Sequence, residues 1–254
     1  KNARVSNGHL REFYNHLESI PDFHFAEMKR DLDAGLFFDS NIPQGYGAGS
    51  SGALCAAIYE RYFDKKPFEW SDGNIVNLKV LFGKMEAHFH GASSGGDPLI
   101  CYLNKPVLMG EDGSFTEVKM PGKLPLAVGL VDTKLPRKTA PLVQHFLEKC
   151  EDKNFKTAIE NELVIYNEKA IQSFLDGRDD VLDWTRRISK FQFKHFQKMI
   201  PASFSSWWEN GLATNKYYLK LCGAGGGGFL LAFSSDSVMF QNELTDQAII
   251  PVEF

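Results

Sequence analysis

The sequence lacks an excess of positive charge. Its 254 residues contain 28 Lys and Arg against 32 Asp and Glu, so the formal net charge is −4. Proteins that bind nucleic acid or an anionic membrane surface usually carry a basic patch or stripe. The composition therefore predicts neither a nucleic-acid nor a membrane partner.

Cysteine is also scarce, with four residues and no CxxC pair: Cys55, Cys101, Cys150 and Cys222. This spacing supports neither a zinc ribbon nor a redox motif. Buried free thiols in a reducing compartment are the simplest interpretation, which predicts a cytoplasmic protein.

No hydrophobic run is long enough to cross a membrane. The uncharged stretch from Asn41 to Tyr59 is interrupted by Pro, Gly and Ser, whereas a span needs about 20 mostly apolar residues. Apolar residues nevertheless make up 43% of the chain and aromatic residues 13%, mostly Phe. A sizeable core rich in large side chains is expected.

The pattern of apolar residues predicts alternating helices and strands in two α/β lobes, at 1–122 and 123–254. The junction is placed at Pro121–Pro125. The expected helices are His9–Leu36 with a break at Pro21, Asp72–Phe89, Ala140–Cys150, Lys156–Leu175, Val181–Phe196 and Ser203–Asn215. The expected strands are Leu36–Phe38, a hairpin of Leu99–Leu103 with Pro106–Met109, Leu126–Val131, Tyr217–Leu221 and Phe229–Phe233.

A first glycine-rich loop, Pro43–Ser51, precedes an apolar segment that favours a helix. Glycines allow close approach of the backbone, and a helix N-terminus offers unpaired N–H groups to an anion. The loop ends without Gly-Lys-Ser/Thr, so it is not a Walker A motif. A phosphate site and a flexible loop with a capped helix remain open from this segment alone.

A second loop begins at Glu86 and ends at Asp97. A phosphoryl transferase needs one carboxylate for Mg²⁺ and another that orients or deprotonates the acceptor hydroxyl. Either carboxylate alone is more often a solvated surface group. His88 and His90 lack a third ligand at zinc spacing, so a zinc site is not favoured.

A third loop, Gly223–Gly228, contains four consecutive glycines between two apolar strands. Ordering so many glycines is entropically costly. We therefore expect this backbone to pack tightly against another loop or a ligand rather than to serve as a linker.

Taken together, these segments resemble the motifs of the GHMP kinase superfamily. The stretch 43–53 (PQGYGAGSSGA) resembles its ATP phosphate loop, and 220–228 (KLCGAGGGG) resembles its third motif. Within the superfamily, 86–97 (EAHFHGASSGGD) and 131–140 (VDTKLPRKTA) are most similar to mevalonate kinase.

This resemblance implies a role for particular residues. Ser51 and Glu86 would bind Mg²⁺, and Asp97 would be the catalytic base. The residues expected to bind the ATP phosphates are Gly45, Gly47, Gly49, Ser50, Ser51 and Gly52. Those expected to contact the substrate are His90, Ser94 and Thr139. Gly223, Gly225 and Gly226 would support the phosphate loop.

The sequence also departs from the family pattern. The family's first motif, a Lys-bearing strand with a Gly-Glu stretch, has no counterpart in Lys1–Phe38. The opening residues include no Met, and we expect a preceding stretch to supply this motif; its loss from the protein is the alternative. Gly52 stands where Ala is more usual, and Gly96 where a larger residue is often found.

The resemblance implies an α+β, two-lobed GHMP kinase fold, with a ribosomal-protein-S5-like N-terminal lobe and a ferredoxin-like C-terminal lobe. It further implies an ATP- and Mg²⁺-dependent kinase that phosphorylates the primary hydroxyl of mevalonate. A kinase for another small acid or sugar, or a non-catalytic nucleotide sensor, is the alternative. The Phe-rich helices suit either a core or a homodimer interface.

Overall fold

The computed structural model describes residues 2–64, 72–110, 112–122, 124–137, 139–236 and 249–252. The chain is α+β and divides into two compact units. Unit 1 consists of Lys1–Pro43 and Gly49–Val118, and unit 2 consists of Gln44–Ala48 and Lys119–Phe254. The first glycine-rich loop is thus divided, since its central segment belongs to unit 2.

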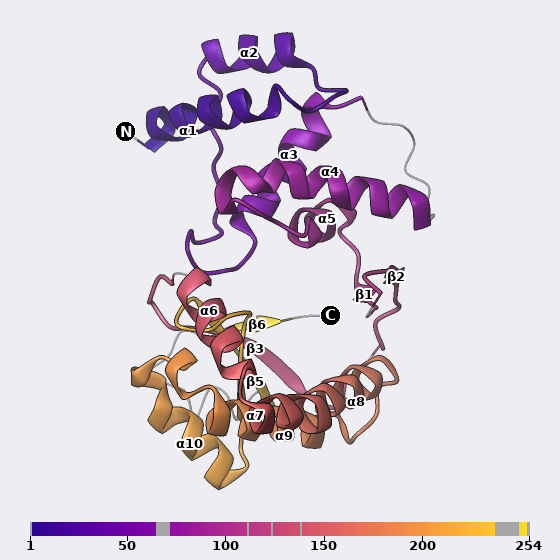
Figure 1. Cartoon of the computed structure of the whole chain (residues 1–254), viewed down its shortest axis with the longest axis vertical. Coiled ribbons are helices and arrows are strands. Elements are labelled where there is room, and N and C mark those ends of the chain that lie inside the picture. Colours follow the sequence, from indigo (N-terminus) through magenta and orange to yellow (C-terminus); the bar gives the residue numbers. More distant parts are fainter. Residues whose placement is uncertain are drawn as a thin grey trace. The chain divides into compact units, whose positions relative to one another are not determined.

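Unit 1 is mainly helical in its described residues. Its elements are α1 (Asn2–Leu17), α2 (Phe25–Asp33), α3 (Ser50–Tyr62), α4 (Asp72–His90), α5 (Gly96–Leu103), β1 (Val107–Met109) and β2 (Phe115–Glu117). Helices α1 and α2 lie side by side (Figure 1). The further strands of an S5-like lobe are not among the described residues of this unit.

The expected amphipathic stripes face the core of unit 1. Leu10, Phe13 and Leu17 of α1 are buried, as are Phe82 and Met85 of α4. Helix α1 ends at Leu17, close to where Pro21 predicted a break, and α2 resumes the stripe. The helical interpretation of this region is therefore confirmed.

Two expected strands of unit 1 are not formed. Leu99–Leu103 lies in helix α5 rather than in a hairpin, because Gly95 in a left-handed conformation begins the helix and Asn104 in the same conformation ends it. Strand β1 pairs instead with β2, across the turn that contains Asp112 and Gly113. The segment 36–38 forms no strand in the described chain, and Ser6 fixes it through hydrogen bonds with the Phe38 backbone.

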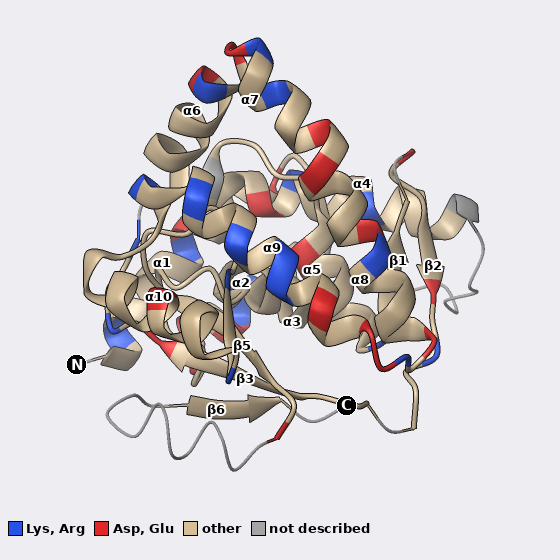
Figure 2. Ribbon diagram, turned by 90° about the horizontal axis from the view of Figure 1, so that it is seen from below, with Lys and Arg blue, Asp and Glu red and all other residues tan. Residues whose placement is uncertain are grey.

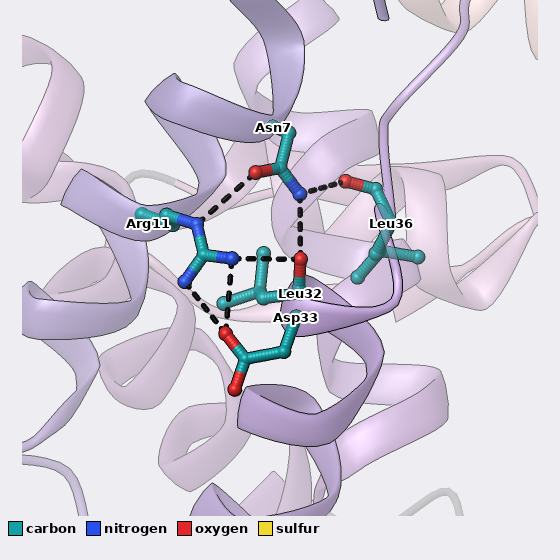
Figure 3. Close-up of polar contacts among 5 residues, drawn as sticks. All are labelled: Asn7, Arg11, Leu32, Asp33 and Leu36. Atoms are coloured by element: carbon teal, nitrogen blue, oxygen red, sulfur yellow. Dashed lines mark hydrogen bonds and ion pairs between the residues drawn. The ribbon is translucent and has the colours of Figure 1, made fainter. Parts of the chain in front are cut away.

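Side chains of α1 bind the C-terminal end of α2 (Figure 3). The Asn7 amide donates to the carbonyl oxygens of Leu32, at 3.0 Å, and Leu36, at 2.6 Å. Arg11 donates to the Leu32 carbonyl at 2.8 Å and pairs with Asp33 at 3.0 Å. These contacts satisfy carbonyl groups that a helix end leaves without intrahelical partners.

Unit 2 contains a four-stranded antiparallel sheet in the order β4-β5-β3-β6. In chain order the first and third strands are central, as in a ferredoxin-like sheet. Its elements are β3 (Ala127–Asp132), α6 (Thr139–Cys150), α7 (Lys153–Ala158), a π-helical segment (Ile159–Val164), α8 (Ile165–Leu175), α9 (Val181–His195), two short 3₁₀ turns (Gln197–Met199 and Ala202–Phe204), α10 (Ser205–Thr214), β4 (Tyr218–Leu221), β5 (Phe229–Ser234) and β6 (Ile249–Val252).

The core of unit 2 fixes the strands on both sides of the third glycine-rich loop. Val131, Leu221 and Leu230 pack with aromatic residues of α9 and α10 in one buried cluster. The buried amide oxygen of Gln192 on α9 accepts a hydrogen bond from the Leu221 N–H at 2.9 Å. Strand β4 is therefore held at the point where the glycine loop begins.

Charges of both signs are interspersed along the described helices (Figure 2). This distribution agrees with the balanced composition. None of the described helices combines the length and apolar character that a membrane crossing requires.

Replacing Asn7 tests the contact between α1 and α2. We expect Asn7→Ala to lower the free energy of unfolding by about 1–3 kcal/mol, because two carbonyl groups lose a hydrogen-bond donor. Asn15→Ala, at an exposed position of the same helix, is the control and should change stability by no more than about 0.5 kcal/mol. Urea unfolding followed by circular dichroism measures both. Equal losses in the two variants would contradict the assigned role.

His88 predicts a pH dependence of stability. Burial is the main cause that lowers the pKa of His88, and the charge of His16 lowers it further. The charge of Glu12 acts in the opposite direction. The folded state thus binds the proton more weakly than the unfolded state, so the free energy of unfolding should fall as pH drops below about 6.5. His88→Phe should reduce this loss, measured by urea unfolding between about pH 7.5 and about pH 5.5.

His9→Gln is the control for this experiment, since His9 is exposed on α1. It should leave the pH dependence unchanged. Burial also lowers the pKa of His195, so the His88 variant should retain part of the trend. An unaltered pH profile in His88→Phe would rule out the assignment.

Candidate functional site

In unit 1 the candidate site is organised around the buried carboxylate of Glu86, on α4. Glu86 is only 4% exposed. Ser51 at the start of α3 donates a hydrogen bond to Oε1 at 2.9 Å, and Ser93 donates to Oε2 at 2.5 Å. Among the described residues Glu86 has no ion pair with Lys, Arg or His. Two hydroxyl groups therefore hold a buried carboxyl group that has no cationic partner within the part of the chain that the structure describes.

The pair of Ser51 and Glu86 fits a magnesium ion. Mg²⁺ is usually held by one or two carboxylates together with substrate phosphates and water. A buried carboxylate beside a hydroxyl supplies oxygen ligands of this kind. No group of three or more His, Cys, Asp or Glu side chains in the described part of the chain is arranged to hold a metal by itself.

Ser93 connects Glu86 to the loop before α5. Its Oγ accepts a hydrogen bond from the Gly95 N–H at 3.0 Å. Gly95 has φ +73°, and a Cβ there would lie 2.0 Å from the Lys79 carbonyl oxygen, so this loop rests directly on the α4 backbone. Sequence reasoning assigned no role to Ser93, because nothing local distinguishes it from Ser94.

Asp97 lies in the first turn of α5, and its side chain is exposed. Helix α5 packs closely against α3 at Gly52. A Cβ at Gly52 would lie 2.9 Å from both the Asp97 carbonyl carbon and the Pro98 nitrogen. The unusual glycine at position 52 is thus explained by the close approach of the backbone that carries Asp97.

The other residues predicted in unit 1 are less tightly placed. Ser50 is the first residue of α3, and neither it nor Ser51 caps that helix, since the N-cap is Gly49 in a left-handed conformation. Ser94 is exposed, and its Oγ accepts a hydrogen bond from the Gly96 N–H at 3.3 Å. His90 ends α4, but its side chain lies outside the described residues.

A hollow of about 370 Å³ also lies on unit 1. It is formed by Lys79, Val80, Gly83, Lys84, Ala87, Ala92, Ser93 and Ser94. Neither Glu86 nor Asp97 lines it, so this hollow is not the point where the predicted catalytic groups converge.

In unit 2 the segment Gln44–Ala48 rests on the end of the sheet. The Gly45 carbonyl accepts a hydrogen bond from the Arg137 N–H at 3.0 Å. The Tyr46 ring packs edge-on against the Phe229 ring, with the ring centroids 5.3 Å apart. Burial, together with the charge of Asp132 and a hydrogen bond to it, raises the pKa of Tyr46. The middle of the first loop is therefore anchored at both backbone and side chain.

The third glycine-rich loop packs against this segment. A Cβ at Gly228 would lie 2.1 Å from the Tyr46 carbonyl oxygen. The Gly228 carbonyl accepts hydrogen bonds from the Thr133 N–H at 3.0 Å and Oγ1 at 2.6 Å, and its own N–H donates to Leu135 at 2.7 Å. The expectation of tight packing against another loop is confirmed.

The remaining predicted residues of unit 2 have distinct surroundings. Gly225 and Gly226 approach the Met199 carbonyl oxygen and the Leu142 side chain so closely that a Cβ would clash, at 2.5 and 2.4 Å. Thr139 begins α6 and is exposed. The sequence alone assigned no separate role to Tyr46 or Arg137, although both lie inside segments that resemble family motifs. Their place in those motifs is the one sequence feature that could have pointed to them.

The chain is similar to known proteins in sequence and in fold. Residues 11–105 match the family model described as the GHMP kinases N terminal domain. Mevalonate kinase from L. major, crystallised with R-mevalonate, has a similar structure, with a TM-score of 0.58 and 16% identity over 80% of this chain. Phosphomevalonate kinase from Streptococcus pneumoniae, in complex with phosphomevalonate and AMPPNP, has a TM-score of 0.57 and 18% identity over 84% of this chain.

The chain spans 64% of the L. major mevalonate kinase chain and 70% of the S. pneumoniae chain. A search of the curated proteins found no match.

Replacing Gly52 tests the contact between α3 and α5. We expect Gly52→Ala to lower the free energy of unfolding by about 1–3 kcal/mol, because the new Cβ meets backbone that cannot move independently of α5. Gly8→Ala is the matched control: Gly8 is also in a helix, but its Cβ would have nothing within 4 Å. It should stabilise by about 0.5–1 kcal/mol.

Thermal and urea unfolding measure both glycine variants. A Gly52→Ala protein as stable as the parent would show that α5 can withdraw from α3, contrary to the packing described.

Residues 11–105 thus match the GHMP kinase N-terminal domain, and the chain is similar in fold to mevalonate kinase and phosphomevalonate kinase.

Proposed function

We propose that this protein is an ATP-dependent kinase that transfers a phosphoryl group to the primary hydroxyl of mevalonate, giving 5-phosphomevalonate and ADP. The observation that carries the proposal is the contact of α5 with α3 and α4. This contact places the backbone of Asp97 beside Gly52. Gly52 directly follows Ser51, whose hydroxyl donates a hydrogen bond to Glu86. A base and a metal-binding pair are then carried by neighbouring segments of one unit.

In this proposal Asp97 accepts the proton of the substrate hydroxyl. The hydroxyl oxygen forms a bond to the γ-phosphorus of ATP while the bond to the leaving ADP oxygen breaks. Such a reaction depends mainly on positioning and on stabilisation of charge. The exposure of Asp97 suits a base that must reach an incoming substrate.

Ser51 and Glu86 would hold Mg²⁺, which supplies neutralisation of phosphate charge when bound. Ser93 would keep the second Glu86 oxygen in place. The N–H groups of Gly45, Gly47, Gly49, Ser50 and Gly52 would bind phosphate oxygens. Gly223, Gly225 and Gly226 would support that loop, and His90, Ser94 and Thr139 would contact the acceptor.

Replacing Asp97 tests the proposed base. We expect Asp97→Asn to lower kcat by about 10²- to 10⁴-fold, because the amide cannot accept the proton, while ATP affinity changes little. Glu18→Gln, an exposed carboxylate beyond the end of α1, is the control and should retain the parent kcat. Coupled detection of ADP release measures turnover. An Asp97→Asn enzyme with parental turnover would remove Asp97 as the base.

Phosphomevalonate is the second candidate substrate, because the phosphomevalonate kinase from S. pneumoniae is about as similar in structure as mevalonate kinase. A panel of mevalonate, phosphomevalonate, homoserine and galactose distinguishes the acceptors. Highest kcat/KM with mevalonate supports the proposal, and a preference for another acceptor overturns it. ATP binding without turnover of any acceptor would favour a nucleotide sensor.

A further inference from the structure

We propose that Arg137 is a positioning residue that locks the phosphate-loop segment Gln44–Ala48 to the third glycine-rich loop. This inference rests on the proposed function, since it concerns how the phosphate loop is held. Its structural basis lies wholly within unit 2.

Arg137 contacts both loops through hydrogen bonds. Its backbone N–H donates to the Gly45 carbonyl at 3.0 Å. Its guanidinium NH1 donates to the Cys222 carbonyl at 2.5 Å, at the start of the third loop. One residue thereby joins segments that lie far apart in the sequence.

The guanidinium also occupies the space that side chains at two glycines would need. A Cβ at Gly47 would lie 1.8 Å from Arg137 NH2, and a Cβ at Gly223 would lie 3.2 Å from the same atom. Gly47 and Gly223 both have positive φ, at +65° and +63°. A side chain at Gly47 would therefore displace the guanidinium from this position, in addition to straining the turn.

Hydrogen bonding alone does not explain where the guanidinium lies. The Arg137 Nε–H is buried and has no hydrogen-bond partner among the described residues, which is costly for a charged group. A buried position that leaves one donor without a described partner fits a group retained for what it holds in place.

Arginine suits this role better than lysine. Its planar guanidinium offers several N–H groups in fixed directions, so NH1 can bind one loop while NH2 lies against the other. A lysine ammonium has the same charge but cannot span both contacts. Fixing the loop before phosphate arrives reduces the conformational entropy lost on binding.

A double-mutant cycle of Arg137→Ala and Gly47→Ala tests the proposal. Alanine at Gly47 should lower stability and raise the Kd for ATP about tenfold or more, since its Cβ clashes with the guanidinium. In the Arg137→Ala background the clash is gone, so the same substitution should have a smaller effect. Additive effects on stability and on ATP affinity would overturn the proposal.

Gly45→Ala is the matched control. Gly45 has a similar φ of +76°, but its Cβ would meet only Pro136 Cβ, at 3.6 Å. It shares the backbone strain of Gly47→Ala without the guanidinium contact, and its carbonyl is retained. Its effect should be the same with Arg137 present or replaced. Equal coupling of Gly45 and Gly47 to Arg137 would also count against the proposal.

Two further measurements separate the possible roles of Arg137. Arg137→Lys should weaken ATP binding nearly as much as Arg137→Ala, with little change in adenosine binding. Full recovery of ATP affinity with Lys would show that charge alone matters.

The double-mutant cycle of Arg137 and Gly47 is also measured by unfolding of the protein in the absence of nucleotide. A parent protein that binds no ATP would refute the proposed kinase function, while coupling between Gly47 and Arg137 in unfolding would still establish the lock.

Discussion

Direct contact between backbone segments, with no side chain between them, is the constraint on which the candidate site depends. In unit 1 it occurs where Gly52 meets the backbone of Asp97 and where Gly95 meets that of Lys79. In unit 2 it occurs where Gly228 meets the backbone of Tyr46. Each contact is closer than a Cβ would permit, so glycine is required by packing and not only by the turn.

These contacts have a common consequence for chemistry. A glycine loop that is free in solution must lose much conformational entropy before it can bind a phosphate group. Here two of the glycines are already fixed: Gly228 accepts hydrogen bonds from Thr133 and donates one to the Leu135 carbonyl, and Gly45 accepts one from Arg137. A reaction that depends on positioning benefits from loops that are ordered in advance.

The buried carboxylate of Glu86 introduces a different constraint. Burial of an ionised group costs free energy unless hydrogen bonds or opposite charge compensate it. Ser51 and Ser93 supply hydrogen bonds, but the described structure shows no cationic partner. The same hydroxyl groups link α4 to the start of α3 and to the loop before α5, so the hydrogen bonds of this buried carboxyl group also fix the relation of three segments of unit 1.

Much of the fold followed from local pattern. The helices of 139–214 and the central strands of unit 2 lie close to where apolar periodicity placed them. The error at Leu99–Leu103 has a clear cause. A short apolar run is compatible with either a strand or a helix. Here Gly95, Asn104 and the packing of α5 against α3 favour the helix. Strand β6 was missed because Ile249–Val252 is short and contains Pro251; only its pairing with β3 makes it a strand.

The sequence by itself determined which residue types gather in three loops, and hence the resemblance to a family and the candidate roles of Glu86, Asp97 and the glycines. Residue type and spacing are local properties, so they can be read along the chain. Only the tertiary structure decided that Ser93 holds Glu86, that Gly52 faces Asp97, and that Arg137 lies between two glycine loops. Those contacts join segments far apart in sequence or depend on how helices meet, and no local pattern specifies them.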